Sequence, residues 1–159
     1  MILNENLIPQ INELFEQCLC NSIQFHEKID ICIVPETLVK KILEITNIDI
    51  SNHLITIDNY GITHTLLQHG NPISEAKRGQ ISVEKEDFTN FIKVVLMPDK
   101  IKLLENTKRS NLPQILFEIG KMNRKIVVME IRTVTTKKKK KVSRLVFQTM
   151  YKKAKSNKD

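Results

Sequence analysis

"RKIVVMEIRT", residues 124–133, is the stretch that decides the fold class of this chain. It is a short run rich in Ile and Val, which is typical of a β-strand. Alternate side chains of a strand share a face, so Ile126 and Val128 lie on the same face as Glu130 and Arg132. This face is apolar at one end and polar at the other, which predicts that the sheet leaves the core there and lines a cleft.

Three further runs have the same character, "KIKLLEN" (100–106), "QILFEIGK" (114–121) and "VSRLVFQTMY" (142–151). Turn signals separate the four runs, and the last separator is the five-lysine run of residues 137–141. The pattern predicts a meander of four antiparallel strands, with the lysines in the loop of its last hairpin.

The chain before Pro98 has helical periodicity instead. Asp58 is a natural N-cap for a helix that carries His64 and His69 and stops at Gly70, where a left-handed residue is easy for glycine. Ser82 is expected to cap the helix that Pro98 closes. The predicted elements are helices over 7–20, 35–46, 59–69 and 84–97 and one buried strand over 29–34.

Helices followed by strands predict an α+β fold, in which N-terminal helices pack on one face of a twisted four-stranded or slightly larger antiparallel sheet. The other face is expected to stay open. No repeat or Pro-, Gly- or Ser-rich linker divides the chain. We therefore expect a single domain over 1–154, with a helix–strand–helix portion in 1–50, the polar motifs in 51–154 and a basic tail over 155–159.

The composition of the 159 residues, 41% hydrophobic and 27% charged, is that of a globular protein. No apolar run approaches the roughly 20 residues of a membrane span, and Glu5 lies where a signal peptide would be basic. A cytoplasmic location is therefore expected. Cys18, Cys20 and Cys32 are odd in number and lack zinc-site spacing, which predicts reduced core residues.

The net charge of +7 is concentrated near the C-terminus. From Lys137 onward there are ten Lys and Arg residues against one acid, which leaves 15 of 25 basic and 17 of 18 acidic residues before that point. Such asymmetry predicts RNA or DNA as partner ahead of a membrane, although a lysine run can also be a solvated loop. The lysines expected to contact nucleic acid are Lys138, Lys139, Lys140, Lys152 and Lys153.

The segment "HTLLQHGNPISEAKRGQI", residues 64–81, places two histidines on one helix ahead of Arg78. His64 and His69 are five residues apart, about 140° around a helix, so they do not form a chelating pair and no metal site is expected. The chain also lacks a Walker loop, a dinucleotide fingerprint and a GxSxG motif. The chemistry left is acid–base and phosphate chemistry.

The last strand repeats the change from apolar to polar. Simple alternation places Leu145 and Phe147 on one face with Thr149 and Tyr151, so this row too is apolar at one end and polar at the other. The alternative interpretation is a strand end that reaches solvent.

These residue types fit RNA cleavage without a metal. The 2′-OH of RNA can attack the neighbouring phosphodiester when a base removes its proton, cations stabilise the phosphorane and an acid protonates the 5′-oxygen. Histidine titrates near neutral pH, and arginine binds phosphate oxygens with a rigid fork. His64, His69, Arg78, Arg132 and Thr149 supply the groups, and the products would carry 2′,3′-cyclic phosphate and 5′-OH ends.

Several motifs then occur in a recognisable order over residues 57–154. They are an H-x4-HG pair, an acidic residue before RGQI, a helix ending in PDKI, a strand ending in an acid and an arginine, and a terminal TMYKK. With these motifs the chain resembles the phage and mobile-element nuclease domains grouped with barnase, EndoU, the tRNase colicins and RelE, the BECR superfamily.

The resemblance implies a metal-independent endoribonuclease with no cofactor, acting as a toxin or a phage or mobile-element effector. RNA, with tRNA as one candidate, would be the substrate, and an immunity protein or antitoxin a partner. The five-lysine loop departs from the superfamily pattern in its length and charge. Residues carried over from the resemblance are His64, His69, Arg78, Thr149, Tyr151 and Lys152, whereas Glu130 and Arg132 rest on the strand pattern.

Two other classes of protein fit the same sequence. One is a catalytically inactive RNA-binding protein of this fold, and the other is a phage structural or interaction domain. Each residue also has a purely structural interpretation. His69 would favour the negative end of the helix dipole, and Arg78 would pair with Glu75 or Glu86. Oligomeric state and the RNA sequence cut are not encoded in any recognisable pattern.

Overall fold

The computed structural model describes residues 6–20, 25–104, 112–120 and 123–154. The predicted tail over 155–159 and the end of the predicted strand over 100–106 lie outside these residues. The elements, in chain order, are α1 (Leu7–Cys20), β1 (Lys28–Ile33), α2 (Glu36–Thr46), β2 (Leu54–Asp58), α3 (Asn59–His69), α4 (Pro72–Lys77), β3 (Gln80–Ile81), α5 (Asp87–Leu96), β4 (Lys100–Leu104), β5 (Gln114–Ile119), β6 (Arg124–Thr135) and β7 (Lys141–Lys153).

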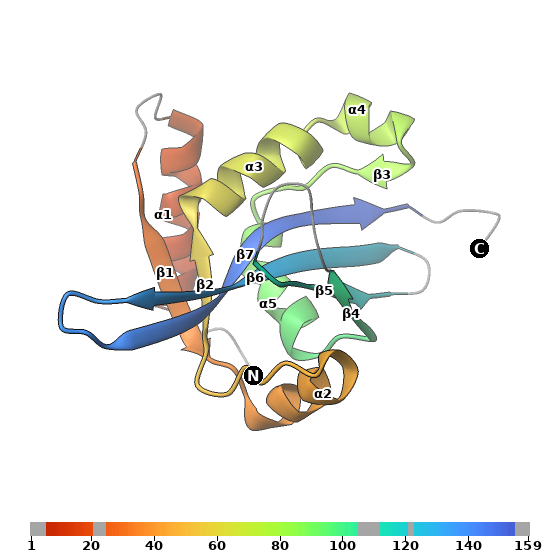
Figure 1. Ribbon diagram of the computed structural model, residues 1–159. Helices are drawn as coiled ribbons and strands as arrows, with labels where there is room; N and C mark the ends of the chain where they lie inside the picture. Colours follow the sequence, from red (N-terminus) through yellow and green to blue (C-terminus); the bar gives the residue numbers. More distant parts are fainter. Residues whose placement is uncertain (1–5, 21–24, 105–111, 121–122, 155–159) are drawn as a thin grey trace.

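The α+β class is confirmed, and the four late strands form the predicted antiparallel meander (Figure 1). The sheet is larger than predicted, with seven described strands in the order β1-β2-β7-β6-β5-β4 and β3 on the end of β7. It is also mixed, because β2 pairs in parallel with β7. The expectation of a purely antiparallel sheet was therefore wrong at this one pair.

The helices build the main core on one side of the sheet. Phe88 of α5 contacts Phe147 of β7 with ring centroids 5.9 Å apart, and Phe91 of the same helix lies 5.1 Å from Phe147. Phe15 of α1 reaches this group through Phe88, at 5.5 Å. Thus α5 packs directly on the sheet as predicted, whereas α1 packs on α3, α5 and strand β1.

A β-bulge in β7 changes which side chains share a face. Val128 pairs with Thr149 while the next residue of β6, Met129, pairs with Phe147, so Gln148 is an extra residue. One extra residue moves every later side chain to the opposite face. The prediction that Leu145 and Phe147 share a face with Thr149 and Tyr151 was therefore wrong.

We call the two sides of β6 and β7 the core face and the polar face. The bulge places Thr149 and Tyr151 on the polar face, the face of Glu130 and Arg132. Ile126 and Val128 are buried on this face, so it is not open along its whole length as predicted. The core face carries Val127, Met129, Leu145, Phe147 and Met150, all within the main hydrophobic core.

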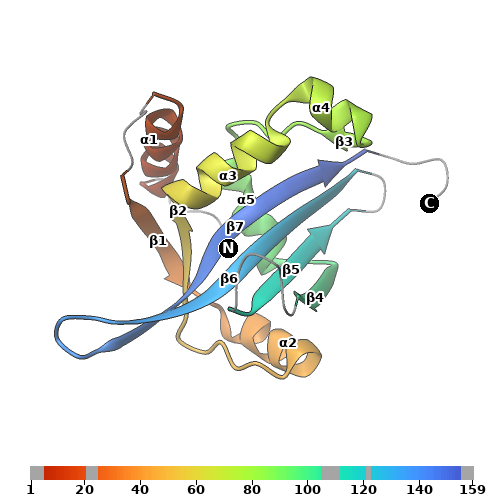
Figure 2. The same ribbon diagram turned by 45° about the horizontal axis from the view of Figure 1, so that its top comes forward.

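Helix α3 runs alongside β7 in both views (Figures 1 and 2). Asp58 caps it as predicted, accepting a hydrogen bond from the Gly61 amide at 2.9 Å. A Cβ on Gly61 would lie 2.4 Å from the Phe147 carbonyl oxygen, so only glycine allows this approach. Gly70 ends the helix, but with φ −92° and not in the predicted left-handed conformation. Glycine fits there because a Cβ would lie 2.5 Å from the Leu66 carbonyl oxygen.

The segment after α3 folds through a short helix and a tight turn. The Asn71 side chain caps α4 by accepting from the amides of Ile73 and Ser74. Gly79 has φ +71°, which a residue with a side chain rarely adopts, and this turns the chain into β3. Ser82 does not cap the next helix as expected, because α5 begins only at Asp87.

The three cysteines are free thiols. Burial raises the pKa of Cys18 and of Cys32; at Cys18 a hydrogen bond with Thr63 lowers it, while the charges of Asp58 and Glu27 raise it further. The prediction that all three cysteines belong to the core was wrong for Cys20, which is exposed. Among the described helices, none is both long and apolar enough to cross a membrane.

Candidate active site

A histidine, a glutamate and an arginine meet where α3 ends and α4 begins. His69 is the last residue of α3, and its Nδ1 lies 3.2 Å from Oε2 of Glu75. The other oxygen of Glu75 accepts a hydrogen bond from the Arg78 guanidinium, which also donates to the Gln68 carbonyl. Glu75 is fully buried, whereas 47% of the Arg78 side chain is exposed. One buried carboxylate thus holds both predicted site residues, His69 and Arg78.

Tyr151 adds a phenol to this group from the end of β7. Its ring stacks on the His69 imidazole, with centroids 5.4 Å apart and an interplanar angle of 28°. Burial raises the pKa of Tyr151, and the charge of Glu118 raises it further, while Arg124 lowers it. The phenol is therefore protonated, and able to donate, at neutral pH. We call His69, Glu75, Arg78 and Tyr151 the His69 cluster.

Thr149 borders the His69 cluster on the polar face. Its hydroxyl lies 3.5 Å from that of Thr65 in α3, and Thr65 is fully buried. Thr65 and His69 are four residues apart, so they share one side of the helix. Successive polar residues of α3 therefore meet successive polar residues of β7, Thr65 with Thr149 and His69 with Tyr151.

Two cationic side chains flank Tyr151. Lys153 Nζ lies 5.9 Å from the centroid of the Tyr151 ring. Arg124, at the start of β6, is the direct strand neighbour of Lys153, and its Nη1 lies 3.9 Å from Glu118 Oε1. Their positive charges suit the binding of a phosphate group next to the His69 cluster.

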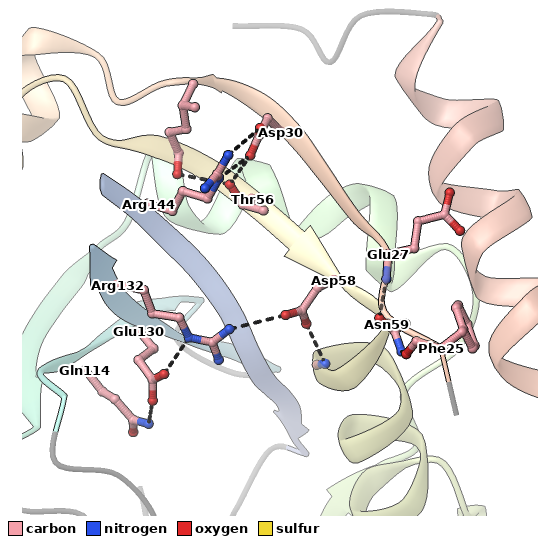
Figure 3. Close-up of polar contacts among 12 residues, drawn as sticks. Phe25, Glu27, Asp30, Thr56, Asp58, Asn59, Gln114, Glu130, Arg132 and Arg144 are labelled. Carbon is pink, nitrogen blue, oxygen red and sulfur yellow. Dashed lines mark hydrogen bonds and ion pairs between the residues drawn. The ribbon is translucent and has the colours of Figure 1, made fainter. Parts of the chain in front are cut away.

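Glu130 and Arg132 belong to a second polar group on the same face (Figure 3). Arg132 Nε donates to Glu130 Oε1 at 2.6 Å, and its Nη1 donates to Asp58 Oδ2 at 3.3 Å. The second oxygen of Glu130 accepts from Gln114 Nε2 at 3.0 Å. Asp58 and Glu130 are 2% and 5% exposed, so two buried carboxylates hold one guanidinium. We call these four residues the Arg132 cluster.

The two clusters lie at opposite ends of α3. Asp58 is the N-cap of this helix and His69 is its last residue, and the 11 residues of α3 at about 1.5 Å each separate them by roughly 16 Å. The strand register agrees, because Arg132 pairs with Arg144, seven residues before Tyr151 on β7. The sequence pattern had suggested that Glu130 and Arg132 share one cleft with His69. The structure does not bring these residues together.

His64 is also separated from His69. It lies on α3 about 140° around the helix axis from His69, whose side of the helix faces β7. His64 is partly buried and lies on a different side of the helix. The two histidines thus lie on different sides of α3, as their five-residue spacing predicted.

The lysines predicted to contact nucleic acid occupy three different environments. Lys138, Lys139 and Lys140 are exposed in the turn between β6 and β7, as predicted. Lys153 lies beside Tyr151. Lys152 Nζ forms an ion pair with Asp87 at 2.8 Å, and this mostly buried contact ties β7 to α5 on the core face.

Three residues of this region were not predicted as site residues, Glu75, Thr65 and Arg124. Glu75 had a signal, because it precedes Arg78 by three residues, the spacing of a helical ion pair. No local sequence pattern could have identified Thr65 or Arg124, since their contacts depend on how α3 and β6 lie against β7. The bulge at Gln148 hides that arrangement from any alternation pattern.

A hollow of about 260 Å³ lies between α1 and β1 and contains none of the predicted site residues. Among the described residues, the carboxylates of Glu13, Glu27 and Asp30 line it, together with one cation, Lys28. An anionic phosphate would be repelled there, so this hollow does not compete with the His69 cluster as a nuclease site.

The family comparison agrees with the cluster of acid–base and phosphate-binding groups. A family model described as phage-Barnase-EndoU-ColicinE5/D-RelE like nuclease3 matches residues 33–159. The chain belongs to this nuclease family. The match begins at the end of β1, so the nuclease3 region contains the two polar clusters and the lysine turn and reaches further toward the N-terminus than the motifs at 57–154 indicated. No curated protein and no solved structure matches the chain.

Membership of the nuclease3 family makes the chain a nuclease of the BECR type. Within the described ranges, no group of three or more His, Cys, Asp or Glu side chains is placed to hold a metal ion. The groups that this structure brings together at the end of β7 are an imidazole, a buried carboxylate, a phenol and several cations.

Proposed function

We propose that the chain is an endoribonuclease that cleaves RNA by 2′-OH transesterification, and that the His69 cluster is its active site. The observation that supports this most is the hydrogen bond from His69 to the buried Glu75. A carboxylate at Nδ1 favours the tautomer with a proton on that nitrogen, which leaves the lone pair of Nε2 as a base.

The other groups then have distinct roles. His69 accepts the proton of the 2′-OH, and Tyr151, whose phenol carries its proton at neutral pH, donates a proton to the leaving 5′-oxygen. Arg78 and Lys153 hold the phosphate oxygens, and the Thr149 hydroxyl positions one of them. Glu75 positions His69 and Arg78 without touching the RNA. The His69 side chain is only 11% exposed, so the reacting nucleotide must be unstacked to reach it.

The test is cleavage of total tRNA and of other cellular RNA in the presence of EDTA, followed by mapping of the ends. We expect discrete products with 2′,3′-cyclic phosphate and 5′-OH ends. His69→Ala and Arg78→Ala should each lower the cleavage rate by at least about a hundredfold, the loss expected for one acid–base or charge-stabilising group. His26→Ala is the matched control, because His26 is exposed and its ring lies tilted against that of Tyr60, away from the His69 cluster.

Other outcomes would identify other functions. Shifted but intact RNA would favour the catalytically inactive RNA-binding protein, and no effect on RNA would favour a phage structural or interaction domain. If EDTA abolished cleavage and a divalent cation restored it, the proposed mechanism would be refuted, although the protein would still be a nuclease. A toxin role, with an antitoxin or immunity protein as partner, would be supported by growth arrest on expression that His69→Ala abolishes.

A further inference from the structure

The hairpin formed by β6 and β7 extends beyond every neighbouring strand (Figures 1 and 2). β5 pairs with β6 only as far as Glu130, and β2 pairs with β7 only over 144–146. The two strands continue to pair with each other alone out to Thr135 and Lys141. We call residues 133–143 the lysine arm. Because no strand in the described part of the chain pairs with the lysine arm on either side, the arm adds little to the core.

The lysine arm carries an uncompensated charge of +5. Residues 137–141 are all lysine and all exposed, and the arm contains no acidic residue. Within the described part of the chain, none of the five lysines takes part in an ion pair. Five like charges on one turn repel one another, so a polyanion is the partner that relieves them.

The surface between the arm and the His69 cluster is not basic. Arg144 is held by Asp30 through two hydrogen bonds of 2.9 and 3.2 Å, and Arg132 is held by Asp58 and Glu130. Counted as ionised, these two arginines and three carboxylates sum to −1. The charge along β7 is therefore positive at the arm, slightly negative in the middle and slightly positive around Tyr151, where Arg78, Arg124 and Lys153 outnumber Glu75 and Glu118.

The two basic regions are about one helical turn of nucleic acid apart. Lys141 and Tyr151 are ten residues apart on β7, which at about 3.3 Å per residue, less the bulge and twist, is roughly 30 Å. A backbone strand of a double helix returns to the same side once per turn, and the A-form turn of an RNA duplex, at roughly 30 Å, is shorter than the 34–36 Å of DNA. A single strand laid along β7 would instead place its middle phosphates over Arg132 and Arg144, whose positive charges are already paired with Asp58, Glu130 and Asp30.

We infer that the substrate is an RNA stem-loop held at two points, with its loop in the His69 cluster and its stem backbone on the lysine arm about one helical turn away. This inference rests on the proposed endoribonuclease function. It adds a requirement on the substrate, a stem of about ten base pairs or more, since an A-form RNA duplex rises by roughly 2.8 Å per base pair.

The experiment uses stem-loops with one common loop and stems of 4, 7, 10 and 13 base pairs. For the wild-type protein we expect kcat/KM to rise at least about tenfold between the 7- and 10-base-pair stems and then to level off. The variant Lys138→Gln, Lys139→Gln, Lys140→Gln should cut the 4-base-pair substrate at the wild-type rate and show no rise. For binding of this variant to the 10-base-pair stem, the slope of log affinity against log salt concentration should be smaller in magnitude by roughly two to three.

The control variant removes three exposed charges from the helices, with Lys40→Gln and Lys41→Gln in α2 and Lys93→Gln in α5. Its kcat/KM should still rise with stem length as in the wild type. No stem-length dependence in the wild type, or an equal loss on all stems in the arm variant, would overturn the inference. Binding of the same RNAs is measured by fluorescence anisotropy. If no RNA is cut but affinity still rises with stem length through the arm, the endoribonuclease proposal fails while two-point binding stands.

Discussion

Glu75 determines the geometry of the His69 cluster at the level of single residues. It is fully buried on α4, yet each of its oxygens meets a side chain with a separate task, His69 on one and Arg78 on the other. Burying a carboxylate is costly unless its hydrogen bonds are satisfied, so the pair of contacts makes this position tolerable. Glu75 thereby fixes the distance between the proposed base and the proposed phosphate-binding cation.

Tyr151 gives a residue-scale prediction about pH. Its pKa is raised first by burial and then by Glu118, so above about pH 10 the unfolded chain loses this proton before the folded one does. The unfolded state then binds fewer protons, and stability falls as pH rises from about 10 through the folded pKa. Tyr151→Phe should remove this decline, seen as a smaller drop in Tm between pH 8 and pH 10.5.

The same substitution tests the proposed proton donor. Tyr151→Phe keeps the ring that stacks on His69 but lacks the hydroxyl, so cleavage at pH 7 should fall by about a hundredfold with Tm unchanged within a few degrees. Tyr60→Phe, on the exposed side of α3, is the control and should keep full activity. Unchanged cleavage by Tyr151→Phe would assign the acid role to another group.

Helix α3 is the element on which the site depends, because it carries polar residues to β7 at both ends. Its approach is set by Gly61, where a Cβ would lie 2.4 Å from the Phe147 carbonyl oxygen and 2.8 Å from a carbon of the Phe147 ring. Gly61→Ala should push α3 away from β7 and cost about 1–3 kcal/mol, a fall in Tm of roughly 3 to 10 °C. Cleavage should fall as well, because His69 moves with the helix.

Leu67→Ala in the same helix is the matched control for Gly61→Ala. Its side chain is 81% exposed, so its loss should change stability by no more than about 0.5 kcal/mol. Thermal unfolding and cleavage measured on both variants check the prediction. A Tm for Gly61→Ala equal to that of the wild type would mean that α3 is not held by this contact.

Most elements of the fold could be predicted from the sequence because their signals are local. Helix α1 shows its apolar side over residues 7–20, and the four late strands show short β-rich runs. β2 was missed because five residues carry too little periodicity to separate strand from loop. The parallel pairing of β2 with β7 was missed because it depends on a long crossover that no local pattern encodes.

The site was less predictable than the fold for the same physical reason. His69 and Arg78 could be identified as polar residues in an apolar context, and they do share Glu75. Glu130 could be predicted to lie beside Arg132 on the same strand face, but Asp58, the other partner of Arg132, could not, since it is 74 residues away in the sequence. The bulge at Gln148 then reverses the faces of β7, so an alternation pattern assigns Tyr151 to the wrong side of the sheet.

At the scale of the whole molecule, the polar face divides into regions with different tasks along β7. The lysine arm lies at one end and the His69 cluster at the other. Between them, the ion pairs of the Arg132 cluster join β2, β6 and the start of α3. The central region therefore holds the sheet and helix together, which keeps the two functional ends at a fixed separation.

This division predicts that Arg132 stabilises the fold and does not bind the scissile phosphate. Arg132→Ala leaves Asp58 and Glu130 buried without their cation. Breaking a buried ion pair costs about 3–5 kcal/mol, and partial exposure of the guanidinium puts the expected cost near 3 kcal/mol, a fall in Tm of at least about 6 °C. Because Asp58 and His69 are roughly 16 Å apart along α3, cleavage by the folded variant should stay within about threefold of the wild-type rate.

Arg144→Ala provides the comparison for that prediction, since Arg144 also forms a paired contact on the polar face but with Asp30, whose side chain is 35% exposed. Its loss should cost about 1 kcal/mol or less, because solvent screens such a pair and hydrates the carboxylate left behind. Thermal unfolding and single-turnover cleavage below the Tm of each variant separate the two effects. Arg132→Ala with an unchanged Tm and a hundredfold loss of cleavage would instead place Arg132 on the RNA, and the active site would then have to extend along the whole of α3.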